Sequence, residues 1–262
     1  MSGTVAQVHA QARNSFKDNL SVKSQIGLFL SLGGDLLTEC ISYCGFDWVL
    51  IDTEHSPNEL DSVVRQLQVL GASATHAIVR PAAGDAILIK RLLDVGVMNL
   101  LIPDVRSAEQ AAAMVAATRY PPYGVRGVSG NARASRFGLD RDYAKHADQN
   151  ICVIIQIESV EGLQQIKEIA RVPGVDAVFI GAADLAASMG YLGRSDAPPV
   201  QASVDGALAT LKAMNVPSGY LGMDKDQLQR RFHDGVSILG VATDTAIVLQ
   251  GAMALRKAFP AS

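Results

Sequence analysis

Two acidic residues, each placed just beyond an apolar run, are the first candidates for chemistry in this sequence. Glu158 closes the run 154–158, and Asp184 follows residues 177–180 and a Gly-Ala-Ala segment. Between the two runs, Leu163, Ile166 and Ile169 recur at helical steps, which predicts a β–α–β unit with parallel strands. Ligands bind at the carboxyl ends of such strands. Because hard cations prefer oxygen ligands, two carboxylates meeting there predict a divalent metal site.

A second set of polar residues follows two other apolar runs. The run 48–52 ends at Asp52 and continues through Thr53 and Glu54 to His55, and the run 76–80 ends at Arg80. The Asp-x-x-His spacing allows the Asp52 carboxylate to orient the imidazole, as a general base requires. Arg80 is placed to hold an anionic group or a developing oxyanion. The alternative is that these are turn, surface or solvated side chains without a catalytic role.

Alternating strand and helix patterns must position these residues. Helical patterns cover residues 35–43, 57–70, 86–93, 107–118 and 244–259, and the polar residues 1–22 are predicted to form a lead-in helix. Eight strands between helices predict one α/β domain over residues 1–262, a (β/α)8 TIM barrel, which typically needs roughly 250 residues. The predicted strands are 25–30, 48–52, 76–80, 99–102, 151–158, 177–181, 219–222 and 237–242.

Residues 119–138 interrupt this alternation. They contain four Arg and four Gly without any period. Irregular loops of this length are uncommon in compact domains and are usually functional. We therefore expect a long active-site loop that covers the substrate, the alternative being a packing or subunit-contact loop. A dicarboxylate substrate would need a cation beyond the metal, and Arg126, Arg133 and Arg136 of this loop are candidates.

Composition excludes several classes of function. A formal net charge of −3 and a pI of about 5.9 leave no electrostatic footprint for nucleic acid or an anionic membrane. No apolar run approaches the roughly 20 residues of a membrane span. The first residues lack the pattern of a secretory signal, so we expect a cytoplasmic protein. The three cysteines, Cys40, Cys44 and Cys152, are expected to be buried or half-buried free thiols.

Lysine placement argues against covalent imine chemistry. A Schiff-base aldolase needs a lysine at its site. None of the predicted strands ends in lysine, and Lys90, Lys167 and Lys212 fall on helical segments.

Long blocks of this sequence resemble the HpcH/HpaI aldolases. The blocks GFDWVLIDTEHSPNE, TRYPPYGVRGV and GVDAVFIGAADLAASMGYLG occur in the family's order, and the resemblance extends over about residues 14 to 250. These enzymes are class II pyruvate aldolases of the phosphoenolpyruvate/pyruvate barrel superfamily. The resemblance implies reversible cleavage of a 4-hydroxy-2-oxo acid, such as 4-hydroxy-2-oxoheptane-1,7-dioate from aromatic compound catabolism, to pyruvate and an aldehyde. It also implies a divalent metal, Mg²⁺, Mn²⁺ or Co²⁺.

The resemblance assigns roles to individual residues. Glu158 and Asp184 match the metal ligands, and Gln156 lies beside the bound pyruvate. His55, oriented by Asp52, matches the acid/base histidine, which acts through a metal-associated water. The remaining matches are Arg80 at the keto or enolate oxygen, the backbone around Gly181, Ala182 and Ala183 at the pyruvate carboxylate, and Asp94 near a subunit interface.

Family members look like trimers of dimers with an exchanged C-terminal helix, which implies a homo-hexamer.

Three residues depart from the family pattern. Phe29 occupies a position on the aldehyde side of the pocket where relatives often have Trp. Ala182 stands where the family usually has proline, and Thr53 stands where a smaller residue is common. These departures bear on the identity of the substrate rather than on the reaction class.

Two alternative functions remain. One is a CoA-thioester lyase of the malyl-CoA or citramalyl-CoA type, and the other is a pyruvate-binding barrel without turnover.

Overall fold

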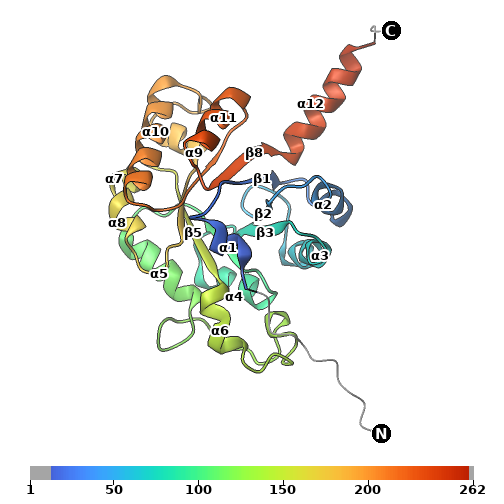
Figure 1. The fold of residues 1–262 in the computed structure, drawn as a ribbon, viewed down its shortest axis with the longest axis vertical. Helices are drawn as coiled ribbons and strands as arrows, with labels where there is room; N and C mark the ends of the chain where they lie inside the picture. The colour runs from blue at the N-terminus through green and yellow to red at the C-terminus, as the bar shows by residue number, and fades with distance from the viewer. Residues whose placement is uncertain (1–12, 260–262) are drawn as a thin grey trace.

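Eight parallel strands close into a barrel in the computed structural model, which describes residues 13–259 (Figure 1). Each strand pairs with the next in sequence, and β8 pairs with β1. The predicted (β/α)8 barrel is therefore confirmed, with strand bounds within one residue of those expected. The strands are β1 (Gln25–Leu30), β2 (Trp48–Asp52), β3 (His76–Arg80), β4 (Asn99–Ile102), β5 (Cys152–Ile157), β6 (Ala177–Ile180), β7 (Ser218–Leu221) and β8 (Ile238–Thr243).

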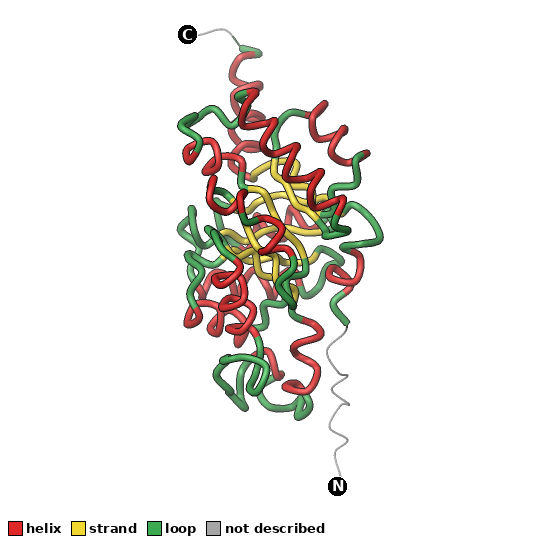
Figure 2. Tube along the Cα trace, turned by 90° about the vertical axis from the view of Figure 1, so that its left-hand side faces the viewer, coloured by secondary structure: helices red, strands yellow, loops and turns green. Residues whose placement is uncertain are grey.

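Helices surround the barrel, except for α12, which leaves its edge and runs away from the strands (Figures 1 and 2). The sequence patterns did not delimit α6, α10 or α11. Two prolines open α10, and proline is tolerated in a first helical turn. The helices are α1 (Ser15–Asn19), α2 (Asp35–Ser42), α3 (Leu60–Leu70), α4 (Ala86–Asp94), α5 (Ala108–Thr118), α6 (Tyr143–Asn150), α7 (Val160–Gln164), α8 (Ile166–Ala170), α9 (Ala182–Ser188), α10 (Pro198–Ala213), α11 (Lys225–His233) and α12 (Asp244–Lys257), with a short 3₁₀ helix at Arg133–Ser135.

Side chains alternate along each strand between the barrel interior and the helix layer. On β2, Trp48 and Leu50 belong to the inner cluster, whereas Val49 and Ile51 pack against the helices. The same alternation carries Asp52 inward at the end of the strand. On β2 the inward series therefore changes from apolar at Trp48 and Leu50 to acidic at Asp52.

Packing at the amino end of the barrel is tight and closed. Phe16 of α1 is fully buried and belongs to the inner cluster, so α1 covers this end. The Trp48 ring lies against Gly27, where a Cβ would come within 2.2 Å of the ring. Glycine is needed there because the backbone and the indole approach so closely. The open end of the barrel is consequently the carboxyl end.

Three other expectations concern termini, membranes and thiols. Part of the predicted lead-in helix lies outside the described residues, and only α1 is described within it. Across residues 13–259, no helix combines the length and apolar character that a membrane crossing requires. Cys152 is buried as expected, but Cys40 and Cys44 are exposed. The expectation fails for these two because Cys40 lies on the solvent side of α2 and Cys44 lies in the turn that follows this helix.

Candidate active site

A cavity of about 690 Å³ lies at the carboxyl end of the barrel. Nine of the residues singled out from the sequence line it, and Glu158 is buried beside two of them, Gln156 and Gly181. No lysine is found among the described residues that line it, in keeping with Lys90, Lys167 and Lys212 on α4, α8 and α10. The nine are Phe29, Asp52, His55, Arg80, Gln156, Gly181, Ala182, Ala183 and Asp184.

A buried ion pair joins the ends of β2 and β3, where Asp52 and Arg80 face one another in the strand register. Arg80 donates from Nε to Oδ1 of Asp52 at 2.9 Å and from Nη2 to Oδ2 at 2.8 Å. Burial alone would raise the pKa of Asp52, but the hydrogen bonds and charge of Arg80 outweigh it and hold the pKa below its usual value. This bidentate pair orients the guanidinium rigidly within the cavity wall.

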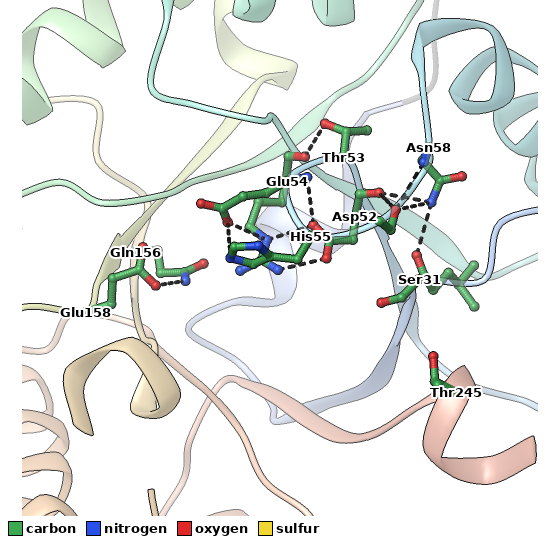
Figure 3. A network of polar contacts seen from close by, with 12 residues as sticks. Ser31, Asp52, Thr53, Glu54, His55, Asn58, Gln156, Glu158 and Thr245 are labelled. Atoms are coloured by element: carbon green, nitrogen blue, oxygen red, sulfur yellow. Dashed lines mark hydrogen bonds and ion pairs between the residues drawn. The ribbon is translucent and has the colours of Figure 1, made fainter. Parts of the chain in front are cut away.

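The imidazole of His55 is therefore not held by Asp52, contrary to the prediction. Both carboxylate oxygens of Asp52 are engaged by Arg80, and Asp52 also accepts the Glu54 N–H at 3.1 Å. The imidazole lies at the cavity with 61% of its side chain exposed, and its Nε2 is 3.8 Å from Oε2 of Glu54 (Figure 3). Local spacing permitted the Asp–His pair, but the neighbouring strand supplied a stronger partner.

Glu54 is a site residue to which the sequence interpretation assigned no catalytic role, with a solvated acid as the alternative. Its Oε2 lies 3.1 Å from Nε of Arg80 and is buried without a well-aligned hydrogen bond. Burial raises the pKa of Glu54, although the charges of Arg80 and His55 oppose the rise. The missed signal was the strand alternation, because Glu54 continues the inward series of Leu50 and Asp52.

The turn after β2 is fixed by side-chain hydrogen bonds to backbone carbonyls. Asn58 donates from Nδ2 to the carbonyl of Asp52 at 2.9 Å and to that of Leu30 at 3.3 Å, and the Ser56 hydroxyl also donates to Asp52. Thr53 donates its hydroxyl to the carbonyl of Arg80 at 2.6 Å. These bonds, part of the network in Figure 3, fix the turn that carries Asp52 and His55.

Glu158 occupies the opposite side of the site, beyond β5. Its Oε1 accepts the backbone N–H of Asp104 at 2.8 Å, and its Oε2 accepts from Nε2 of Gln156. A Cβ on Gly181 would come within 2.6 Å of Oε2 of Glu158, so only glycine permits this approach. Burial raises the pKa of Glu158 to about 7, and the charges of Asp184 and Glu54 add to the rise. Within residues 13–259, neither Glu158 nor Asp184 forms an ion pair, and the charge of Arg80 reaches Glu158 only without direct contact.

These acids suit a divalent cation. Oxygen donors of like charge crowd together, and Oε1 of Gln156 is buried without a partner in the described part of the chain. A hard cation would offset the charge that raises the pKa of Glu158. Within residues 13–259, no group of three His, Cys, Asp or Glu has metal-binding geometry. Glu158 and Asp184 would thus be the two protein ligands, with water or substrate oxygens completing the shell, as is common for Mg²⁺.

Fewer backbone N–H groups around Gly181 are available to bind the pyruvate carboxylate than the resemblance implied. The Gly181 N–H donates to the carbonyl of Ile157 at 3.0 Å and is therefore occupied. Ala182 and Ala183 begin α9, and their N–H groups have no acceptor among the described residues. They remain the backbone donors available to a carboxylate.

Asp94 and the loop 119–138 do not line the cavity in a single chain. Asp94 accepts a hydrogen bond from Nη2 of Arg126 at 3.2 Å, and the Arg126 guanidinium lies between the rings of Tyr120 and Tyr143. Arg133 donates to the carbonyl of Val95. Arg126 and Arg133 are thus bound within the protein, and the loop is anchored beside α4 rather than over the barrel mouth.

Known proteins match this chain over nearly its whole length. A pyruvate aldolase of Rhizobium etli is 47% identical over 94% of this chain and 97% of its own. A 4-hydroxy-2-oxo-heptane-1,7-dioate aldolase of Salmonella dublin is 42% identical over 95% of both chains.

Solved structures agree with the sequence matches. A HpcH/HpaI aldolase/citrate lyase family protein from Burkholderia cenocepacia superimposes with a TM-score of 0.90 at 37% identity, over 94% of this chain and 99% of its own. A citrate lyase beta subunit from M. tuberculosis, complexed with oxaloacetate and magnesium, shares the fold with a TM-score of 0.58 at 16% identity, over 86% of this chain and 93% of its own.

The family model described as HpcH/HpaI aldolase/citrate lyase matches residues 25–250, which include all eight strands and both halves of the site. The acid pair, the arginine and the histidine lie at the barrel mouth in the middle of that match. This protein therefore belongs to the HpcH/HpaI aldolase/citrate lyase family and is a carbon–carbon lyase.

Proposed function

We propose that the protein is a divalent-metal-dependent class II aldolase that reversibly cleaves a 4-hydroxy-2-oxo acid to pyruvate and an aldehyde. One observation carries the proposal: Asp184, the bidentately held Arg80 and the exposed His55 line one cavity, and Glu158 is buried directly beside its lining residues Gln156 and Gly181. The names of the relatives from R. etli and S. dublin support this class of substrate.

Glu158 and Asp184 would hold Mg²⁺, Mn²⁺ or Co²⁺. When bound, such an ion supplies Lewis-acid polarisation of the 2-oxo group. Gln156 fixes one oxygen of Glu158, and the Asp104 N–H fixes the other, so the ligand is oriented before the ion arrives.

Arg80 provides the fixed positive charge for the developing enolate oxygen. Asp52 takes the donors on Nε and Nη2, which leaves further guanidinium N–H groups available to an oxygen in the cavity. Because the guanidinium is already buried and oriented, little reorganisation is needed when negative charge develops. Ala182 and Ala183 would hold the pyruvate carboxylate through their free N–H groups.

His55 is the candidate for proton transfer at the C4 hydroxyl. In cleavage His55 accepts the proton of the C4 hydroxyl, and the C3–C4 bond breaks. The electron pair of that bond passes into the enolate of pyruvate, while C4 becomes the carbonyl carbon of the aldehyde. Protonation at C3 then gives pyruvate, and the reverse sequence forms the new bond. Oε2 of Glu54, 3.8 Å from Nε2 of His55, is the carboxylate oxygen that faces the imidazole.

Proton exchange at C3 of pyruvate, followed by NMR in D₂O, tests the half-reaction without any aldehyde. We expect exchange that requires a divalent metal and that stops on exhaustive chelation. The Arg80→Met variant should exchange far more slowly than the wild type. Proton exchange that persists without metal would contradict the proposal. A protein that neither exchanges pyruvate protons nor releases pyruvate from 4-hydroxy-2-oxo acids would also contradict it.

We also infer a homo-oligomer, a hexamer built as a trimer of dimers, with α12 exchanged between subunits. Asp244 is the buried residue of α12, and its carboxylate binds the backbone of the loop after β1. The rest of this helix carries exposed apolar side chains and lies apart from the barrel (Figure 1). Exposed apolar residues also mark the loop 119–138, which favours its interpretation as a subunit contact. Light scattering of the intact protein measures the assembly, and a monomer at micromolar concentration would contradict it.

A further inference from the structure

The active-site cavity is larger than pyruvate requires. Of its roughly 690 Å³, a three-carbon acid fills only a fraction beside Arg80 and Asp184. The cavity also extends to residues on and near α10 and α11, and none of the candidate site residues discussed above lies in that part. We call this continuation the distal half. It is lined by Ser195, Asp196, Gln201, Met223, Asp224, Gln227 and Arg230.

Two glutamines form a hydrogen-bonded wall in the distal half. Oε1 of Gln201 accepts from Nε2 of Gln227 at 2.6 Å and from Nη2 of Arg231 at 3.0 Å. Nε2 of Gln201 donates to the carbonyl of Ser195 at 2.6 Å, and Oε1 of Gln227 accepts from the Tyr220 hydroxyl at 3.0 Å. Because both amides are occupied within the protein, they shape the cavity and offer little to a ligand.

Arg230 and Arg231 are neighbours on α11 with opposite environments. Arg231 is buried, pairs with Asp205 at 3.0 Å and lies 4.2 Å from the centre of the Tyr220 ring. Arg230 is exposed and lines the cavity three residues after Gln227, on the same helix face. Its guanidinium has no acceptor among residues 13–259. Arg230 is therefore the cation that the distal half can offer to a ligand.

Two acids of the distal half, Asp224 and Asp196, could also pair with Arg230, and their surroundings differ. Asp224 caps α11, and its Oδ1 accepts the Gln227 N–H at 2.7 Å, so its charge faces the helix N-terminus. Asp196 is exposed, and no contact of its carboxylate occurs in the described structure. A neutral hydroxylated aldehyde would suit Asp196, whereas an acidic aldehyde would suit Arg230.

We propose that Arg230 determines aldehyde specificity by binding a carboxylate at the far end of the aldehyde. This inference rests on the proposed aldolase function and identifies the residue that selects its second substrate. A guanidinium recognises a carboxylate through paired charge-assisted hydrogen bonds, which a neutral aldehyde cannot form. It also replaces the candidates offered by the sequence, because none of Arg126, Arg133 and Arg136 lines the cavity. As Arg230 is exposed, the selectivity weakens as salt is added.

Two aldehydes of equal chain length, 4-oxobutanoate and butanal, measure this selectivity in aldol addition to pyruvate. The quantity is the ratio of their kcat/KM values. We expect Arg230→Gln to lower the ratio about tenfold by loss of addition to 4-oxobutanoate, with butanal unchanged. Arg230→Lys should retain part of the ratio. Lys225→Gln is the matched control, because it removes an equal charge from the same helix at a residue that does not line the cavity.

Three results would overturn the proposal: a wild-type enzyme indifferent to the carboxylate, an unchanged ratio in Arg230→Gln, or an equal loss in Lys225→Gln. Preference for glyceraldehyde that disappears in Asp196→Asn would assign specificity to Asp196 instead. Metal-dependent proton exchange of pyruvate is measured on every variant. If exchange is normal, a failed ratio counts against Arg230 alone; if the wild type shows no exchange, the aldolase function has failed.

Discussion

The two sides of the active-site cavity differ in how their charges are balanced. At the ends of β2 and β3, Arg80 is bound by Asp52 through two hydrogen bonds and lies 3.1 Å from Glu54. Beyond β5 and β6, Glu158 has only amide donors, and Asp184 adds like charge. The pKa of Asp52 is lowered as a result, whereas that of Glu158 is raised to about 7.

On the first side, folding alone supplies the counter-charge of the arginine. On the second side, a bound cation would supply the counter-charge of the acids. The Asp52–Arg80 pair needs nothing further for its charges to be satisfied. On the other side, burial and neighbouring acids raise the pKa of Glu158, and a bound cation would favour its ionised form. Each prediction below perturbs one side and expects the other to respond differently.

Removing a charge from the unbalanced side should have the largest effect on activity. Asp184→Asn or Glu158→Gln is expected to lower pyruvate release by roughly 10³-fold or more, because the metal's contribution to the transition state is lost. Steady-state release from a 4-hydroxy-2-oxo acid, with metal affinity measured by calorimetry, checks this. Full activity after chelation in either variant would remove the metal from the assignment.

Breaking the balanced pair should have the largest effect on stability. Asp52→Ala removes the bidentate partner of the buried Arg80 guanidinium and leaves Glu54 at 3.1 Å; breaking such a pair typically costs about 3 to 5 kcal/mol in free energy of unfolding. Glu158→Gln in metal-free protein should instead be neutral or stabilising, because it removes a buried charge that has no counter-ion. Urea denaturation compares the two variants, and equal destabilisation would show that the two sides do not differ. The double variant Asp52→Leu/Arg80→Met serves as the control and should recover part of the loss.

His55 should contribute to turnover and not to metal binding. Because its imidazole is mostly exposed and Glu54 is its one ion-pair partner within residues 13–259, His55→Ala is expected to lower kcat about 10²-fold with little change in thermal stability. Binding of Mn²⁺, followed by electron paramagnetic resonance, should match the wild type. A variant that turns over normally would return the proton-transfer role to another group, with Glu54 the first to test.

Acidity should act on the two sides in opposite directions. The raised pKa of Glu158 stabilises metal-free protein below about pH 4.5, and this contribution is lost as the pH rises through about 7. The lowered pKa of Asp52 stabilises the protein above its ordinary value of 3.8, and this contribution is lost as the pH falls below it. The melting temperature of chelated protein should therefore fall by a few degrees between pH 5 and 8, and Glu158→Gln should remove that fall.

Adding Mg²⁺ or Mn²⁺ is the companion measurement. A bound cation favours the ionised carboxylate, so the fall in melting temperature above pH 5 should be reduced or reversed. If the pH dependence of the Glu158→Gln variant equals that of the wild type, another group titrates in this range.

Local patterns in the sequence determined the barrel and the positions of most site residues. Apolar runs of strand length gave all eight strands, and the two-residue period of a strand places Asp52, Arg80, Gln156 and Glu158 on the inside, where parallel strands end together. These are properties of short segments, so one sequence carries them. The same alternation would have identified Glu54.

Tertiary structure decided which of these groups become partners. The sequence spacing paired Asp52 with His55, but the β2–β3 register puts Arg80 opposite Asp52, and a bidentate charged contact outweighs a local one. The loop arginine Arg126 could have faced the substrate, yet it is buried against Asp94. Such choices depend on contacts between segments far apart in the chain, whose distances and burial no local pattern specifies. The fold therefore decides how the charges pair, and with that which part of the site is left for a cation.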